Sequence, residues 1–230
     1  MYIYGKNVVE ETLKKNQKIK KAFIYTDFKD EKIISDLQKR NICIKYESKK
    51  ELDALANVNH QGIILDVPDY VYADIDDIPT ENAFVLILDH LEDPHNFGAI
   101  IRTAEAAGVD GIIIPKDRSV EVNGTVIKVS AGAIHNMKIV RVTNLVNTMK
   151  YLQKKGFWFT GTDMDGTSYD TLDYRGNIGL VIGNEGKGMS DLVAKNCDFI
   201  ASIPMKGTIN SLNASVAAGI VIFEAVKQRK

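Results

Sequence analysis

The stretch FVLILDHLEDPHNFGAIIRTAEAAGVDGIIIP, residues 84–115, decides the fold class of this chain. It opens with an almost purely apolar run, FVLILD, and closes with a second one, GIIIP. Such strands are typical of a parallel sheet that is covered on both faces. NFGAIIRTAEAAG between them is predicted to be a helix, and Gly108 is placed to end it. A strand, a helix and a strand in this order predict a βαβ unit.

The chain that follows continues this alternation. MKIVRVT, FWFTGTD, IGLVIGNE and FIASIPM are further predicted strands, and NLVNTMKYLQKKG is a predicted helix. The last stretch, ASVAAGIVIFEA at residues 214–225, is apolar on every side, which predicts a helix that is buried all round. We therefore predict an α/β domain with a mostly parallel sheet over residues 83–230.

Residues 1–67 show a different pattern, in which short helical and strand signals alternate. NVVEETLKKN, EKIISDLQKRN and KKELDALA have helical spacing, whereas KKAFIYT, ICIKYES and QGIILDV are typical of strands. These elements predict a small α/β domain of their own. PDYVYADIDDIPTEN, residues 68–82, contains two prolines and a run of acids, so we predict a linker there.

The composition excludes several classes of protein. A hydrophobic fraction of 45% and a charged fraction of 26% are those of an ordinary globular protein. The two cysteines, Cys43 and Cys197, lie far apart, which argues against a disulfide framework or a zinc site and favours a reducing compartment. The sequence shows no secretion signal and no apolar run of roughly 18 residues. We therefore expect a cytoplasmic protein that does not enter a membrane.

The net charge of −1 gives no overall sign of nucleic-acid binding. The one basic cluster is KKNQKIKK at residues 14–21, with five lysines and no acid. Two interpretations stay open, because such a run is either a solvated helix end or a patch that contacts phosphate.

Three turns follow predicted strands in the second domain, and ligands of parallel α/β sheets gather at the carboxyl ends of strands. The first turn holds Asn96, a candidate N-cap whose oxygen would accept a free backbone N–H. Arg102 follows six residues later, where an ion pair with Glu105 would explain it without any function. Its apolar neighbours nevertheless suggest an arginine beside a buried surface.

The second turn, LVIGNEGKGMS, superficially resembles a phosphate loop. That motif needs lysine and then serine or threonine after its second glycine, and here Met189 follows Gly188. The turn therefore argues against a nucleoside triphosphate site, although Glu185 would offer a ligand one strong acceptor.

The third turn, IPMKGTINSLN at residues 203–213, leads into the apolar last helix. Gly207 permits the turn, and Ser211 and Asn213 stand where a helix leaves N–H groups free. Taken alone, the small residues of this region indicate tight packing more than function.

The joint order of these residues resembles the three motifs of the SpoU (TrmH) branch of the SPOUT RNA 2′-O-methyltransferases. The resemblance covers about residues 83–229 and rests on Asn96-x5-Arg102, Gly183-x-Glu185-x-x-Gly188, Ile203-Pro204-Met205 and Ser211-Leu212-Asn213. YGKNVVEETL, HQGIILDV, IPKDRSVEVNGTVIKVSAGA and FEAVKQR are similar to the subgroup that methylates a guanosine of 23S rRNA, in the P-loop of the peptidyl-transferase centre.

The resemblance implies a fold and partners that composition and periodicity do not show. It implies a front domain of the ribosomal-protein L30e type that binds the RNA substrate. It also implies a catalytic domain that is closed by a deep trefoil knot, against the general rule for protein chains. The last helix would pack under the knot and against a second subunit, giving a homodimer through the C-terminal domain.

The implied reaction is methyl transfer from S-adenosylmethionine to a ribose 2′-oxygen, without a metal. The resemblance assigns cofactor binding to Thr162, Gly183, Ile203, Met205 and Leu212. It assigns a polar wall to Glu185, Ser211 and Asn213, and it makes Asn96 the residue that positions Arg102 or the ribose.

The resemblance casts Arg102 as the catalytic base. Holding a guanidinium with a pKa of about 13.8 deprotonated at pH 7 would cost roughly 9 kcal/mol. Transient proton uptake and simple stabilisation of the oxyanion by the cation are easier, and the sequence leaves both open. Arg229 would either bind RNA phosphate or be solvated at the chain end.

Other functions stay possible at this point. The RNA substrate could be a tRNA ribose or a resistance-type rRNA site. A non-catalytic RNA-binding factor is a third reading, against which the complete set of polar motif residues argues. Cofactor binding would separate this factor from an enzyme.

Overall fold

The structure is a computed structural model that describes residues 1–208 and 211–229. The chain folds into two compact units. The first consists of Met1–Val71 and Val122–Gly132, and the second of Tyr72–Glu121 and Ala133–Lys230. Within the described residues, no helix combines the length and the apolar character that crossing a membrane requires.

The first unit is built on a mixed sheet with the strand order β1-β4-β2-β3. Its strands are β1 (Tyr2–Tyr4), β2 (Lys21–Tyr25), β3 (Ile44–Glu47) and β4 (Ile63–Asp66), and its helices include α1 (Lys6–Lys14), α2 (Glu31–Lys39) and α3 (Lys49–Leu55). Asp30 caps α2, and Ser48 with Glu51 forms a capping box on α3. Local sequence signals therefore fix where these helices begin.

A further helix of the first unit, α5 (Gly124–Val129), comes from the middle of the chain. A Cβ atom at Gly124 would lie 2.3 Å from the carbonyl oxygen of Tyr2, so only glycine lets α5 approach β1 this closely. Lys128 Nζ donates to the carbonyl of Asn59 at 2.8 Å. The sequence patterns placed this segment in the domain at residues 83–230 and predicted no helix there, whereas it is helical and packs within the first unit.

The second unit is built on a six-stranded sheet with the order β10-β8-β9-β5-β6-β7. Every neighbouring pair in it is parallel, which confirms the predicted α/β class. The strands are β5 (Phe84–Leu88), β6 (Gly111–Pro115), β7 (Ile139–Val142), β8 (Trp158–Ser168), β9 (Ile178–Ile182) and β10 (Phe199–Ser202). The strand order does not by itself establish the trefoil knot, which stays a prediction.

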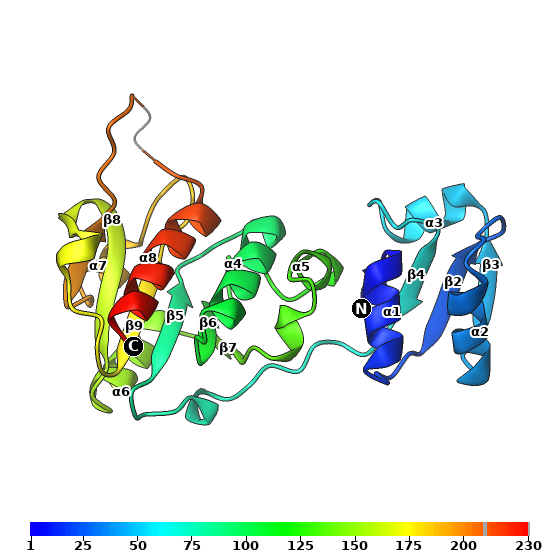
Figure 1. Cartoon of the computed structure of the whole chain (residues 1–230), viewed down its shortest axis with the longest axis horizontal. Helices are drawn as coiled ribbons and strands as arrows, with labels where there is room; N and C mark the ends of the chain where they lie inside the picture. The colour runs from blue at the N-terminus through cyan, green and yellow to red at the C-terminus, as the bar shows by residue number, and fades with distance from the viewer. Residues whose placement is uncertain (209–210, 230) are drawn as a thin grey trace. The chain divides into compact units, whose positions relative to one another are not determined.

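Helices cover both faces of this sheet, as the apolar strands predict. α4 (Pro94–Ala106) and α8 (Ala214–Gln228) contact each other and lie side by side in front of the sheet in Figure 1. α6 (Leu145–Gln153) and the short α7 (Asp191–Ala194) share a core cluster with Val85, Phe159 and Val181. All five residues of the central strand β5 are consequently buried.

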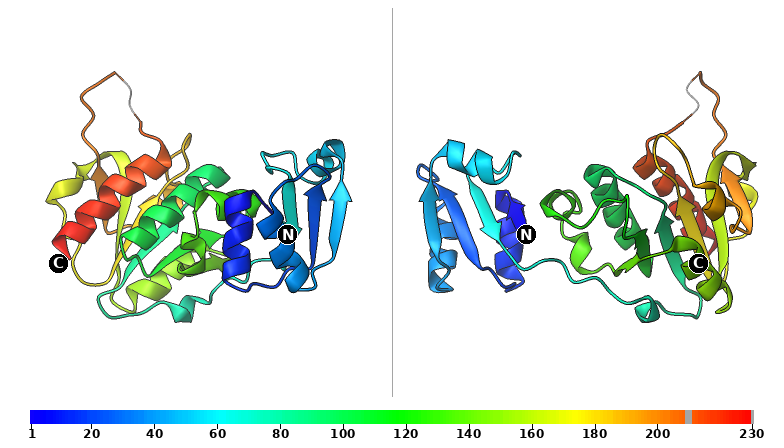
Figure 2. Two further views of the ribbon diagram at one scale, coloured as in Figure 1. Left: turned by 45° about the vertical axis from the view of Figure 1, so that its right-hand side comes forward. Right: turned by 180° about the vertical axis from the view of Figure 1, so that it is seen from behind.

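Two parts of this unit differ from what the sequence suggests. Within residues 68–82, Ala73 pairs with Val140 of β7, and Ile78 is buried, so residues 72–82 pack on the second unit. The last helix is not buried all round in the single chain, because Val216 and Phe223 are each half exposed. Residues 203–208, orange in Figure 2, leave the body of the unit after β10.

Candidate active site

The strand order places a topological switch point beside β5. The chain moves from β5 to β6 and β7 on one side, and then returns to place β9 on the other side. Leu88 and Ile182 are the last paired residues of β5 and β9, so the turns after them start at the same edge of the sheet. Ligands of open parallel sheets bind at such a point.

A cavity of about 690 Å³ lies where the middle of β8 meets the segments that follow β9 and β10. It is lined by all five residues predicted to bind a cofactor, together with two of the predicted polar wall: Thr162, Gly183, Glu185, Ile203, Met205, Ser211 and Leu212. The volume is that of a site for a small organic ligand.

Further residues line the cavity that were not assigned to the cofactor or to the polar wall: Asp163, Met164, Ile182, Asn184, Gly186, Lys187, Gly188, Ala201, Ser202, Pro204, Ala214 and Ala217. Most of them are next in sequence to a residue that was predicted to line the site, and this proximity was the only signal that could have identified them. Asp163 and Met164 line the cavity for a different reason. Ile200 of β10 pairs with Gly161 of β8, but the next residue of β10, Ala201, pairs with Thr167. Residues 162–166 therefore leave the ladder with β10, and no sequence motif indicates this irregularity.

Three predicted polar residues form one hydrogen-bonded network. Asn96 Nδ2 donates to Glu185 Oε1 at 2.6 Å, and Asn213 Nδ2 donates to Asn96 Oδ1 at 2.9 Å. Asn96 is buried, whereas Glu185 and Asn213 are exposed. The network therefore joins α4, the turn after β9 and the start of α8, which lie far apart in the sequence.

The prediction that Asn96 caps α4 is wrong. Asp93 is the N-cap, and its carboxylate accepts from the backbone N–H groups of His95 and Asn96 at 3.1 Å. Pro94 occupies the first turn, where the lack of an N–H has no cost. Because Asp93 satisfies the helix end, the amide of Asn96 is available to bond Glu185.

Asn213 combines a cap with a place in the network. It is the N-cap of α8, where its Oδ1 accepts from the backbone N–H of Ser215 at 3.0 Å and from the Ser215 hydroxyl at 2.6 Å. Its Nδ2 points to Asn96. The same side chain thus fixes the start of α8 and orients the buried amide.

The turn after β9 is held together by hydrogen bonds between its own backbone groups. Asn184 and Gly188 exchange two backbone hydrogen bonds of 2.9 Å, and Gly188 has a φ of +67°, which favours glycine. At Gly183 a Cβ atom would lie 2.3 Å from the backbone of Gly188. These glycines let the turn fold back tightly and present Glu185 toward Asn96.

Arg102 lies apart from this network. Six residues along α4 correspond to a rotation of about 240°, so Arg102 and Asn96 are on different faces of the helix. The side chain of Arg102 is exposed, and its guanidinium forms no hydrogen bond or ion pair with the residues that the structure describes. Glu105, the expected ion-pair partner, instead accepts from Asn136 Nδ2 at 2.8 Å.

Arg229 has a structural role rather than a place in this site. Its guanidinium donates to the carbonyls of Tyr174, Gly176 and Asn82, and it lies over the ring of Phe84. Burial lowers the pKa of Arg229 from its usual value. The interpretation of Arg229 as a solvated terminal residue is therefore wrong, whereas its contact with RNA phosphate stays a prediction.

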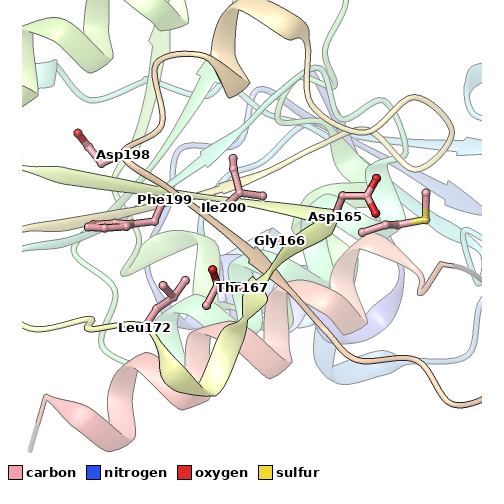
Figure 3. Close-up of a pocket in the computed structure, with 8 residues that line it drawn as sticks. Asp165, Gly166, Thr167, Leu172, Asp198, Phe199 and Ile200 are labelled. Atoms are coloured by element: carbon pink, nitrogen blue, oxygen red, sulfur yellow. The ribbon is translucent and has the colours of Figure 1, made fainter.

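A second cavity, of about 610 Å³, borders the same irregular part of β8 (Figure 3). It shares Met164 with the first cavity, and it is lined by Asp165 and Asp198 but by no lysine or arginine. Two carboxylates without a cation repel phosphate groups, so this cavity does not suit the backbone of a nucleic acid.

Comparison with known proteins agrees with this geometry. Residues 83–223 match the SpoU rRNA methylase family, and residues 2–73 match the substrate-binding domain of RNA 2′-O ribose methyltransferases. The chain is 42% identical to Bacillus subtilis YacO, which is named as a TrmH family tRNA/rRNA methyltransferase. That match covers 99% of this chain and 96% of YacO.

Two solved structures resemble the chain to different extents. An AdoMet-bound rRNA methyltransferase from Sinorhizobium meliloti has a TM-score of 0.78 and 27% identity, and the match covers 98% of this chain and 86% of that one. The TrmH/SpoU tRNA-modifying enzyme of A. aeolicus has a TM-score of 0.59 and 29% identity, over 65% of this chain and 78% of that one. With both domains matched and the five predicted cofactor residues lining one cavity, the chain belongs to the SpoU family of RNA 2′-O-ribose methyltransferases.

Proposed function

We propose that this protein uses S-adenosylmethionine to methylate the ribose 2′-hydroxyl of a guanosine in 23S rRNA, in the P-loop of the peptidyl-transferase centre. The observation that carries the proposal is the network of Asn96, Glu185 and Asn213 beside a cavity of cofactor size. A chain that only bound RNA would not require three separated segments to hold polar groups next to such a cavity.

The cavity has the chemistry that an adenosyl and methionyl ligand requires. Ile182, Ile203 and Leu212 provide apolar walls, while backbone groups of the glycine turn and Glu185 provide polar contacts. The Sinorhizobium meliloti relative is described with AdoMet bound. When bound, S-adenosylmethionine supplies a methyl group on a sulfonium, so the protein needs only to position the acceptor oxygen and stabilise its charge.

The described residues divide this work. Asn96 holds Glu185 on one side and Asn213 on the other, so the carboxylate of Glu185 is oriented at the cavity rather than free in solvent. We assign to Glu185, Ser211 and Asn213 the polar wall against which the ribose lies. Arg102 stabilises the developing charge on the 2′-oxygen, because deprotonating a guanidinium at pH 7 costs roughly 9 kcal/mol.

Arg102 reaches that oxygen from a second copy of the chain. It is exposed and on a different face of α4 from Asn96, so it does not serve the network of its own chain. The neighbouring Thr103 packs at Gly219 of α8, and α8 exposes the apolar side chains of Val216 and Phe223. An apolar helix face next to an arginine without a partner fits a homodimer in which each chain completes the other's site.

Mixed dimers test this division between chains. Arg102→Ala and Asn96→Ala subunits carry different tags and are purified as heterodimers, with each homodimer as control. We expect each homodimer to lose at least about 99% of its activity and the heterodimer to recover up to about half of the wild-type activity, because one of its two sites is intact. An inactive heterodimer would place Arg102 and Asn96 in the same chain's site.

The first unit is proposed to hold the RNA. Within KKNQKIKK, Lys14, Lys15 and Lys20 are partly neutralised by Glu10, Glu11 and Asp66. Lys18 and Lys21 form no ion pair among the residues described, so these two lysines are the better phosphate contacts. Replacing both by glutamine is expected to lower the slope of log affinity against log salt by about 1.4–1.8 for two phosphate contacts.

Ribosomal RNA is favoured over tRNA by the extent of the two structural matches. The relative described as an rRNA methyltransferase matches almost the whole chain, whereas the tRNA-modifying enzyme matches only about two thirds of it. A front domain in addition to the catalytic one is expected where the substrate is a folded RNA that must be recognised by its shape.

Mapping of 2′-O-methyl groups in a deletion strain decides the substrate. We expect one guanosine of 23S rRNA to lose its methyl group and to regain it when the wild-type gene, but not the Asn96→Ala form, is restored. Loss of a methyl group from a tRNA, with 23S rRNA unchanged, would contradict the proposed substrate while keeping the reaction.

A further inference from the structure

Asp89 is a buried carboxylate that the proposed reaction does not use. It directly follows β5 and is 1% exposed, and it is the only buried acidic side chain among the described residues of the second unit. Burying a carboxyl group is unfavourable unless hydrogen bonds replace its water. The partners of Asp89 therefore indicate what its burial is for.

Those partners lie at the far end of the turn that carries Glu185. Oδ2 of Asp89 accepts from the backbone N–H of Ser190 at 2.6 Å and from the Ser190 hydroxyl at 2.8 Å. Nδ1 of His90 lies 2.5 Å from the other oxygen, Oδ1. Both oxygens are thus satisfied, and one of them is bound to a residue 101 positions later in the sequence.

The next residue, His90, holds the near end of the same turn. Its φ of +56° is in the left-handed region, which is uncommon for residues other than glycine, and its carbonyl accepts from Asn184 Nδ2 at 2.9 Å. Asn184 Oδ1 in turn accepts from the backbone N–H of Gly186 at 3.0 Å. Two consecutive residues therefore fix both ends of the turn that spans residues 184–190.

We propose that Asp89 is a positioning residue that sets the affinity for S-adenosylmethionine by fixing the turn at residues 184–190. The inference rests on the proposed function, because it takes this turn to be a wall of the cofactor cavity. Asp89 is buried below the turn and does not line the cavity, so it acts through Ser190 and His90 and does not touch the ligand. Without its carboxylate, Glu185 would lose its fixed distance to Asn96.

Asp110 provides a matched control at the other end of the same strand. Its Oδ2 accepts from the backbone N–H of Phe84 at 2.8 Å, where β5 begins. Asp89 and Asp110 are therefore both carboxylates that accept a backbone N–H beside β5, but only Asp89 is next to the cavity. Changing either carboxylate should lower stability, whereas only the change at Asp89 should lower the affinity for S-adenosylmethionine.

The test compares full-length wild-type, Asp89→Asn and Asp110→Asn proteins by calorimetric titration with S-adenosylmethionine and by thermal unfolding. We expect both variants to unfold at lower temperature, Asp89→Asn to bind about tenfold more weakly, and Asp110→Asn to stay within about twofold of wild type. Affinity of Asp89→Asn within twofold of wild type would overturn the inference, as would equal losses in both variants. Absence of binding by the wild type would instead contradict the proposed function.

Ser190→Ala keeps the inference testable if Asp89→Asn does not fold. This change removes the hydroxyl donor but keeps the backbone N–H, so we expect binding to weaken by about threefold while affinity for RNA is unchanged. Where the variant that combines Asp89→Asn with Ser190→Ala folds, its fold-loss of affinity for S-adenosylmethionine should be smaller than the product of the two single losses, because both changes break the same contact. Wild-type affinity in Ser190→Ala would contradict the proposed role of Asp89.

Discussion

Two asparagines at opposite ends of the large sheet make different contacts, because one bonds other side chains and the other bonds backbone. Asn96 at the carboxyl end bonds Glu185 and Asn213. Asn177, at the amino end just before β9, accepts from the backbone N–H of Ala83 at 2.9 Å and donates to the carbonyl of Thr80 at 2.7 Å. Asparagine thus takes part in the side-chain network beside the cavity at one end and bonds backbone groups at the other.

Other polar residues at the amino end make the same kind of backbone contact as Asn177. At the amino end, Asp110, Asp198 and Arg229 all bond backbone groups and close the sheet. Contacts of this kind stabilise the fold, and none of these three residues lines the cavity that holds Glu185. The carboxyl end should therefore be sensitive in activity, and the amino end should be sensitive in stability.

The largest expected effect comes from breaking the side-chain network at its centre. Asn96→Ala should lower kcat/KM for methyl transfer by about 10²–10³, because the oriented polar wall at the cavity is lost. Asn177→Ala, the matched change at the amino end, should lower thermal stability and leave activity per folded molecule unchanged. Equal activity losses in both variants would remove the distinction between the two ends.

The next effect is on stability, at the amino end. Arg229→Ala should lower the free energy of unfolding by about 2 kcal/mol, because three carbonyl groups lose a charged donor. Urea unfolding of the full chain measures this loss. The control is Lys227→Ala on the same helix, whose side chain is 74% exposed and should contribute almost nothing. A similar small change in both variants would show that the guanidinium clamp does not stabilise the sheet.

Asn213 sharpens the comparison, because it is both a helix cap and a member of the network. Asn213→Ala should destabilise the protein by about 1 kcal/mol through the lost cap, and it should also weaken cofactor binding. Asn144 caps α6 in the same way but takes no part in the network. Asn144→Ala should therefore match the loss of stability and keep the affinity for S-adenosylmethionine, and weaker binding in it would count against the network.

The smallest effect concerns the dependence of stability on pH. Burial raises the pKa of the Cys197 thiol to about 12, from an ordinary value of 9.0. The folded protein therefore keeps the thiol neutral while the unfolded chain ionises, so stability is full below pH 9 and falls as pH rises toward 12. The expected loss from this thiol is about 0.8 kcal/mol at pH 9.5.

Denaturant titrations at pH 7.5 and pH 9.5 measure that loss. Cys197→Ala should reduce the difference between the two pH values, whereas Cys43→Ala should not, because Cys43 is exposed. An unchanged difference in Cys197→Ala would mean that other groups set the alkaline limit.

The sequence predicts the fold of the second unit well, because its signals are local. Apolar strands, helical spacing and stop signals such as Gly108 lie within a few residues of each other. The segment Val122–Gly132 was missed because its reason is distant: Gly124 matters only when α5 meets Tyr2, more than 120 positions earlier in the chain. Partial exposure of Val216 and Phe223 was likewise invisible, since an apolar sequence does not say whether its own chain or another covers it.

The candidate site was predicted as a set of residues but not as a set of contacts. All five residues proposed for the cofactor line one cavity, and Glu185 was placed in the polar wall. The local rule for caps failed at Asn96, because Asp93 and Pro94 start the helix three residues earlier than that rule suggested. Asp89 gave no signal, because an acid after an apolar strand becomes informative only once its partner Ser190 is known.

The central claim is that the residues at the carboxyl end of the sheet transfer a methyl group to a ribose oxygen. Incubation of the purified full-length protein with 23S rRNA and methyl-labelled S-adenosylmethionine, followed by alkaline hydrolysis, tests it most directly. The account predicts label in an alkali-resistant dinucleotide, since a 2′-O-methyl group blocks cleavage, with strong loss in Asn96→Ala and none in Asn177→Ala. Label in alkali-sensitive mononucleotides would place the methyl group on a base and contradict the account, as would equal labelling by Asn96→Ala and the wild type.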